Sequence, residues 1–147
     1  MKKYMQIALK EAQKAFDENE VPVGAIIIYK DELIASAHNM MEQSNDATAH
    51  CEMTAIKRAA EILKTSNLSG CSLYVTMEPC PMCMGGVILS KISKVVFGCY
   101  DFQFGACGGY IQLGKHPYSK NIEIYGGIME KECSDLSKEF FKQIRQS

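Results

Sequence analysis

The sequence predicts an α/β fold, a three-layer α/β/α sandwich on a mixed five-stranded sheet. Three observations predict it: segments with helical apolar spacing, short runs of β-branched residues between them, and a regular alternation of the two in the second half of the chain. The chain has 147 residues and is 47% hydrophobic, which is enough for one core and too little to require two. We therefore expect a single domain, residues 1–147.

The first half of the chain is expected to open with a helix and a β-hairpin. Residues 2–18 place apolar side chains at helical spacing, which predicts an amphipathic helix. Residues 23–29 and 33–38 have the composition of strands and flank the polar segment 30–32. This pattern predicts two antiparallel strands joined by a short turn.

A second helix is expected to begin near Thr48. The apolar residues that recur there at helical period are Ala49, Met53, Ile56, Ala60 and Leu63. His50 and Glu52 then fall in its first turn. Because two positions along a helix differ by about 200° of rotation, both side chains can approach one metal ion only if it lies beyond the N-terminal end of the helix.

The second half alternates strands and helices. Residues 72–77 and 94–99 predict strands, and the helix expected between them runs from Cys80 to about Ser90. Such alternation favours parallel pairing of buried strands. A fifth strand is expected near residues 122–125, and a closing helix over residues 132–145.

Three side chains have the spacing of a zinc site with a carboxylate beside it. His50 precedes Glu52 by two residues, and the run Pro79-Cys80-Pro81-Met82-Cys83 follows about thirty residues later. Prolines are tolerated in the opening turn of a helix, so Cys80 and Cys83 are expected to face the same way from a helix start. Two thiolates and one imidazole leave tetrahedral zinc one ligand short, and water can bind and be acidified at that position.

Other uses of a C-x-x-C pair are a structural zinc site or a redox pair. A closed structural site would need a fourth Cys or His with similar spacing. Cys51 adjoins His50 but would point elsewhere on the helix, and Cys71 has no paired neighbour. The joint pattern therefore favours catalytic zinc.

Pairing of H-x-E with P-C-x-x-C is the signature of zinc-dependent nucleobase deaminases. The chain resembles the zinc-dependent cytidine and deoxycytidylate deaminase superfamily and, within it, the bacterial tRNA-specific adenosine deaminases. The resemblance runs from about residue 4 to Phe141. The stretches that carry it are residues 20–25, 48–50 with Glu52, 73–76, 78–80, 95–98, and Asp101 with 105–106.

The resemblance implies a cytidine-deaminase-like fold and hydrolytic deamination of adenosine to inosine at the wobble position of tRNA. It also implies one Zn²⁺ per chain, a homodimer, and the tRNA anticodon loop as partner. By the same resemblance, the zinc ligands are His50, Cys80 and Cys83. Glu52 is expected to be the catalytic acid and base that moves protons between water, ring nitrogen and amine.

Further residues are expected around the substrate base. They are Asn39, Val23, Ala49, Met77, Pro79, Asp101 and Phe141. The Asn39 amide can both donate to and accept from a purine edge, although asparagine is also typical of turns. Val23 and Met77 would be apolar walls, or ordinary core residues. Glu78 is expected to cap the helix that begins at Cys80 or to support a metal ligand, without a catalytic part.

Two departures from the family pattern stand out. Cys51 replaces the usual alanine between His and Glu, and we expect it to pack like a small apolar residue. Around Asp101, the usual basic and small residues are replaced by Tyr100, Phe102, Gln103 and Phe104. This second change bears on substrate identity and leaves the zinc chemistry untouched.

Charge is the main objection to an RNA partner. The chain has 16 Lys and Arg against 17 Asp and Glu, whereas RNA-binding proteins usually carry a positive excess. Local basic stretches with aromatic neighbours could compensate, or could be ordinary solvated faces. They comprise residues 115–120, Lys138, Lys142 and Arg145, with Tyr118 and Phe141 nearby.

Three functions remain open at this point. The first is deamination of tRNA adenosine. The second is deamination of free nucleobases or nucleosides such as guanine, cytosine or adenine, which the weak net charge and the altered loop would suit. The third is a zinc-stapled binding module without catalysis. The sequence contains no bilayer-length apolar run, and its seven cysteines suggest no disulfide framework, so we expect a cytoplasmic protein with no membrane partner.

Overall fold

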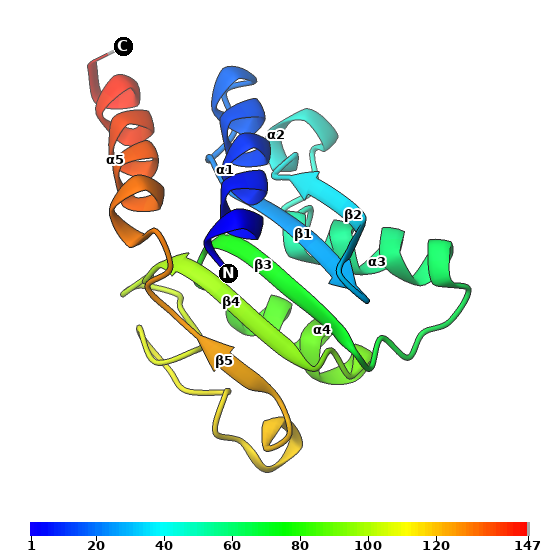
Figure 1. Cartoon of the computed structure of the whole chain (residues 1–147). Coiled ribbons are helices and arrows are strands. Elements are labelled where there is room, and N and C mark those ends of the chain that lie inside the picture. Colours follow the sequence, from blue (N-terminus) through cyan, green and yellow to red (C-terminus); the bar gives the residue numbers. More distant parts are fainter. Residues whose placement is uncertain (147) are drawn as a thin grey trace.

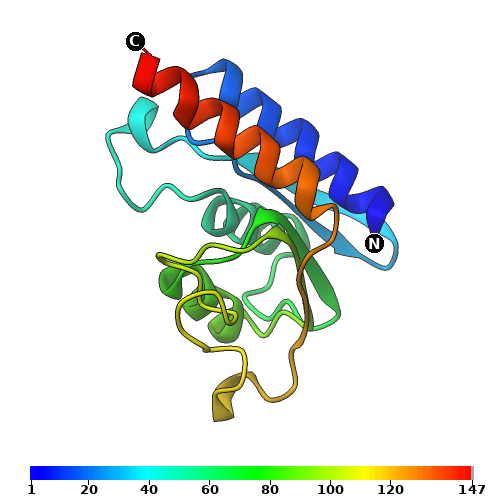
Figure 2. The ribbon, with the colours of Figure 1, turned by 90° about the vertical axis from the view of Figure 1, so that its left-hand side faces the viewer.

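The computed structural model describes residues 1–146 and shows one mixed sheet between two layers of helices (Figures 1 and 2). The strands are β1 (Gly24–Tyr29), β2 (Glu32–His38), β3 (Cys71–Met77), β4 (Lys94–Cys99) and β5 (Glu123–Tyr125), in the order β2-β1-β3-β4-β5. The longer helices are α1 (Lys2–Asp17), α3 (Cys51–Leu63), α4 (Pro81–Ser90) and α5 (Glu130–Gln146). The predicted three-layer α/β/α fold is confirmed.

Strand direction determines where the reactive segments emerge. β1 pairs antiparallel with both β2 and β3, whereas β3, β4 and β5 are parallel. The hairpin turn uses Lys30 and Asp31 with φ of 50° and 63°, the left-handed conformation that tight hairpins require. Because β3 and β4 are parallel, the segments that follow Met77 and Cys99 leave the sheet at the same edge.

A separate core lies on each face of the sheet. The larger core packs β1 to β4 against α3 and α4, and the smaller core packs the opposite face against α1 and α5. Figure 2 shows α1 and α5 lying side by side, and the rings of Phe16 and Phe140 meet there edge to face. The site helices α3 and α4 therefore rest on the larger core.

Predicted and observed elements differ mainly at their ends. His50 and Cys80 are the N-cap residues of α3 and α4, one position before the first helical turn. A short helix, α2 (Met41–Ser44), was not predicted. A 3₁₀ turn, η1 (Pro117–Ser119), precedes β5. Within residues 1–146, no helix combines the length and the apolar character needed to cross a bilayer.

Candidate active site

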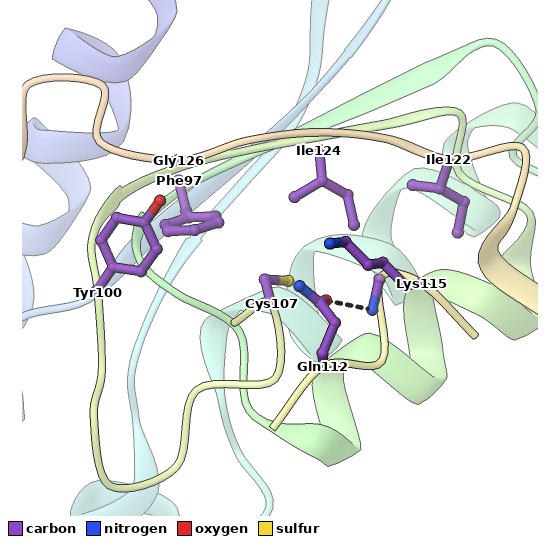
Figure 3. Close-up of a pocket in the computed structure, with 9 residues that line it drawn as sticks. Phe97, Tyr100, Cys107, Gln112, Lys115, Ile122, Ile124 and Gly126 are labelled. Atoms are coloured by element: carbon purple, nitrogen blue, oxygen red, sulfur yellow. Dashed lines mark hydrogen bonds between the residues drawn. The ribbon is translucent and has the colours of Figure 1, made fainter. Parts of the chain in front are cut away.

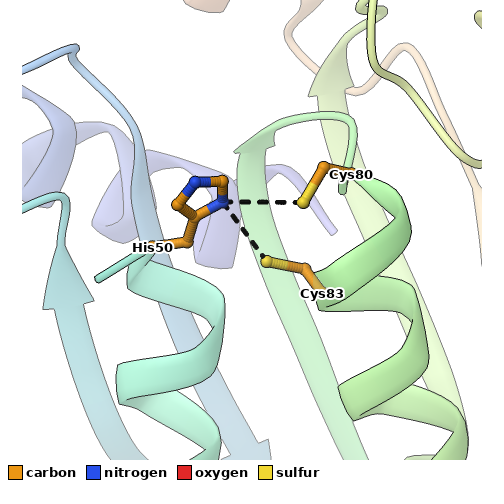
Figure 4. A group of neighbouring side chains, drawn as sticks. All are labelled: His50, Cys80 and Cys83. Atoms are coloured by element: carbon orange, nitrogen blue, oxygen red, sulfur yellow. Dashed lines mark hydrogen bonds between the residues drawn. The ribbon is translucent and has the colours of Figure 1, made fainter. Parts of the chain in front are cut away.

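Two helix N-termini bring the three predicted metal ligands together (Figure 4). His50 Nδ1 lies 3.6 Å from Cys80 Sγ and 3.6 Å from Cys83 Sγ. The three ligand atoms all lie within 4.8 Å of one another. Tetrahedral zinc with Zn–S bonds of about 2.3 Å and Zn–N bonds of about 2.0 Å separates its ligand atoms by roughly 3.5–3.8 Å. The donor set therefore fits zinc in both chemistry and spacing.

The two sulfurs are electrostatically coupled. A hydrogen bond from Cys83 lowers the pKa of Cys80 to about 4, with a further lowering contribution from His50. The same hydrogen bond, together with burial, raises the pKa of Cys83. Because zinc binds thiolates, a bound metal ion would favour loss of the thiol proton at both sulfurs.

Glu52 lies in the first turn of α3, next to the ligand group in sequence. The residue is only 4% exposed, and burial raises the pKa of its carboxyl group. The Cys51 thiol donates a hydrogen bond of 3.3 Å to Glu52 Oε1. A buried carboxyl whose pKa is raised holds a proton more readily than an exposed one, which suits a group that accepts and returns a proton.

Asn39 connects the end of β2 to the start of α3. It is buried, and its Oδ1 accepts a hydrogen bond of 3.0 Å from the Cys51 backbone N–H. Within residues 1–146, no hydrogen bond uses its amide nitrogen. The Asn39 side chain therefore stabilises the N-terminal end of α3, and its amide N–H groups remain available to donate to a ligand.

The remaining predicted base contacts are placed as follows. Ala49 and Pro79 immediately precede the ligands His50 and Cys80. Val23 belongs to the larger core, and Met77 packs against both cores, so their packing also satisfies the simpler core interpretation. Phe141, also predicted to contact the substrate, lies on α5, on the opposite face of the sheet from α3 and α4. It lines a pocket of about 250 Å³ whose other residues include Asn19, Glu20, Val21 and Met41.

Asp101 is the second residue of the loop that follows β4. Its Oδ1 accepts hydrogen bonds from the backbone N–H groups of Gln103 and Phe104, at 3.0 and 3.2 Å. The carboxylate therefore closes a turn of its own loop. The aromatic replacements next to it are solvent-exposed, with Phe102 at 74%.

One of the two roles predicted for Glu78, that of a helix cap, is wrong, and the other, support of a metal ligand, stays a prediction. The N-cap of α4 is Cys80, without a side-chain cap, so Glu78 does not cap this helix. Its carboxylate instead accepts backbone hydrogen bonds from the loop after β4. Its partners lie 23 to 31 residues later in the chain, and no local pattern signals them.

A second pocket, of about 230 Å³, lies between β4, β5 and the loop after Cys107 (Figure 3). It contains none of the three metal ligands. Its lining includes Phe97, Tyr100, Cys107, Gln112 and Lys115. The Gln112 side chain, labelled in Figure 3, accepts a hydrogen bond of 2.9 Å from the backbone N–H of Gly114, which also lines the pocket. The segment from Cys107 to Lys115 therefore forms part of the wall of this pocket.

Comparison with known proteins gives consistent matches. The profile of the cytidine and deoxycytidylate deaminase zinc-binding region matches residues 1–99. A tRNA-specific adenosine deaminase of Bacillus subtilis (strain 168) is 43% identical over 145 residues, covering 97% of this chain and 89% of that protein. The corresponding protein of Aquifex aeolicus (strain VF5) is 42% identical over 144 residues, covering 98% of this chain and 95% of that protein. A solved structure from a study of A-to-I editing by tRNA:A34 deaminases matches with a TM-score of 0.88 and 33% identity, covering 92% of this chain and 99% of that chain.

Proposed function

Because this chain belongs to the cytidine and deoxycytidylate deaminase family, we propose that it converts adenosine to inosine at the wobble position of tRNA. The relatives that it matches over nearly their full length are tRNA-specific adenosine deaminases. The geometry that supports this function is the cluster of three ligand atoms from His50, Cys80 and Cys83, with the buried Glu52 two residues after His50 in the sequence. The enzyme is a zinc-dependent hydrolase formed by one deaminase domain of residues 1–147.

One zinc ion per chain would be held by His50, Cys80 and Cys83. When bound, zinc lowers the pKa of a coordinated water from near 16 toward about 7 and so supplies a nucleophile at neutral pH. The three side chains leave room for that chemistry because they provide only three donors.

Glu52 moves the protons of the reaction. Its carboxylate accepts a proton from the attacking water and delivers protons to the ring nitrogen and then to the exocyclic amine. A C–O bond forms at the carbon that carries the amine, the C–N bond breaks, and ammonia leaves. The raised proton affinity of the buried Glu52 carboxyl suits both halves of this transfer.

The base would be oriented by groups at the edge of the same site. The free amide nitrogen of Asn39 donates to the purine, and the backbone at Ala49 and Pro79 offers further hydrogen bonds. Val23 and Met77 form apolar walls. Asp101 and Phe141 contact the RNA beyond the base.

RNA binding by this chain relies on aromatic side chains more than on charge. Tyr118 is 79% exposed and stacks on His116, next to Lys115 and Lys120. Phe141 is also exposed, on the helix that carries Lys138, Lys142 and Arg145. Stacking of unpaired bases on aromatic rings does not require a positive excess, so a net charge of −1 is compatible with an anticodon loop as partner.

The chain would act as a homodimer in the cytoplasm. α4 is apolar around its whole circumference, yet Leu89 on it is 84% exposed. A helix of this kind is normally buried, so a second copy of the chain is the partner expected on α4.

One assay tests the function. The purified protein is incubated with a tRNA that carries adenosine at the wobble position, inosine is measured, and zinc is determined on the same sample. We expect inosine at that position and one zinc per chain. Ammonia release from free guanine, cytosine or adenine, without inosine in the tRNA, would instead identify a free-base deaminase.

A further inference from the structure

Glu78 is a buried carboxylate that binds a loop and no cation. It follows β3, directly before Pro79, and is 3% exposed. Among residues 1–146, no lysine, arginine or histidine forms an ion pair with it. A buried charge is stable only when hydrogen bonds replace the water it has lost. The Glu78 carboxylate accepts such hydrogen bonds from the loop of residues 100–110, here called the β4 loop.

Both carboxylate oxygens of Glu78 are used. Oε1 accepts from the Asp101 N–H at 3.0 Å, and Oε2 accepts from the N–H groups of Cys107 and Gly109 at 2.7 and 2.8 Å. The neighbouring Pro79 carbonyl accepts from the Ala106 N–H at 2.8 Å. Four hydrogen bonds thus join the β4 loop to the two residues that precede Cys80.

Two glycines allow this close approach. A Cβ atom added at Gly105 would lie 2.4 Å from Glu78 Oε1, and one added at Gly109 would lie 2.2 Å from the same atom. Neither glycine has a positive φ. Any residue could therefore adopt their backbone conformation, and only a hydrogen atom in place of a side chain leaves space for the carboxylate.

Core packing holds only the middle of this loop. Cys107 borders the pocket of Figure 3, and the side chains of Phe102, Phe104 and Tyr110 extend into solvent. Ala106 and Cys107 are buried and belong to the larger core. Core packing thus holds Ala106 and Cys107, whereas the Glu78 carboxylate joins Asp101, Cys107 and Gly109 to the segment that carries Cys80.

We propose that Glu78 is a positioning residue. It holds Asp101 and the exposed aromatic rings of the β4 loop in a fixed position relative to the metal ligands, and this position determines the affinity of the protein for RNA. The proposal rests on the proposed deamination of tRNA. Among the described residues, the hydrogen bonds of the Glu78 carboxylate go to the backbone of the β4 loop and not to His50, Cys80 or Cys83. Its contribution is therefore expected in substrate binding and not in the chemical step.

Steady-state kinetics of Glu78→Gln test this division. Glutamine keeps the size of the side chain but turns an NH₂ group toward a backbone N–H. With a wobble-adenosine tRNA we expect KM to rise about 10- to 100-fold while kcat stays within about threefold, because the loop is displaced and the chemistry is intact. Zinc content should be unchanged. A fall in kcat at constant KM, or loss of zinc, would show that Glu78 acts through the metal site and would overturn the proposal.

Glu11→Gln is the matched control. Glu11 is also a buried glutamate, but it lies on α1, on the other face of the sheet, and pairs with Lys14. If Glu11→Gln raises KM for the tRNA as much as Glu78→Gln does, the effect reflects general loss of a buried carboxylate, and the positioning role is wrong.

Gly109→Ala displaces the loop while Glu78 stays in place. It should raise KM in the same way, and it serves as the test variant if Glu78→Gln does not fold. The double variant should be no worse than the more impaired single variant, because both changes break the same contact. Additive effects would mean that the two residues act independently, against the proposal.

Hydrogen exchange gives a readout that needs no activity. In Glu78→Gln, the amides of Asp101, Cys107 and Gly109 should exchange faster, while those of the β1–β3 ladder should not change. Unchanged protection of the three loop amides would refute the positioning role. If the wild-type protein forms no inosine in tRNA, the proposed function fails, and this exchange measurement still reports separately on the loop.

Discussion

Glu52 carries the proton transfer in the proposed mechanism, so its removal should separate chemistry from binding. We expect Glu52→Gln to lower kcat for tRNA deamination by about 100- to 10,000-fold, the usual contribution of a positioned acid and base. Zinc content and thermal midpoint should stay near wild type. The matched control is Glu61→Gln, at an exposed position on the same helix, which should leave kcat unchanged. Near-normal turnover of Glu52→Gln would assign the proton transfer to another group.

Sequence spacing was informative for residues that act close to their own motif. His50 and Glu52 share one helix start, and Cys80 and Cys83 share another, so a short pattern places each pair. Contacts over long sequence separations could not be seen in this way. Asn39 binds the backbone N–H of a residue 12 positions later, and the partners of Glu78 are up to 31 positions away. Only the fold brings them together.

At the level of elements, β1 depends on close contact with α1. A Cβ atom added at Gly24 would lie 2.1 Å from the Ala8 carbonyl oxygen and 2.4 Å from the Ala12 backbone nitrogen. Because backbone atoms cannot rotate away, Gly24→Ala should lower the free energy of unfolding by about 1–3 kcal/mol. Urea denaturation measures this. Ser36→Ala, on the paired strand β2, should change it by less than about 0.5 kcal/mol. An unchanged midpoint for Gly24→Ala would show that α1 can shift without cost.

Most elements were predicted to within two residues because they are long and periodic or bounded by turn residues. α5 starts at Glu130, two residues before the predicted start, and α2 was missed altogether. The four residues of α2 carry no periodic signal. The backbone N–H groups of Glu42 and Gln43 in its first turn donate hydrogen bonds to the Glu20 carboxylate, which lies more than twenty residues earlier in the chain. The central position of β1 in the sheet likewise follows from packing and not from local pattern.

For the whole molecule, metal removal should distinguish a catalytic ion from a structural one. The sheet and both cores are built from residues other than the three metal ligands, of which Cys83 is buried. Chelation of the protein should therefore abolish inosine formation while the far-UV circular dichroism spectrum is retained, and added zinc should restore activity. Loss of the folded spectrum on chelation would identify a structural metal and favour the binding-module alternative.

Assembly of the whole molecule should depend on the exposed apolar face of α4. Leu89→Lys places a charge on the face that a second copy is proposed to cover. We expect the wild-type protein to have twice the chain mass of 16.4 kDa in light scattering, and Leu89→Lys to have the single mass, because an unpaired buried charge opposes association.

The matched control for this change is Leu33→Lys, an exposed leucine on β2, which should leave the doubled mass intact. Since the ligand Cys80 is the N-cap residue of α4, any loss of activity in Leu89→Lys must be compared with its zinc content. If Leu89→Lys keeps its zinc but has the mass of a single chain, its loss of activity results from the loss of the dimer. A wild-type mass of 16.4 kDa, or a doubled mass for Leu89→Lys, would contradict dimerisation through this helix.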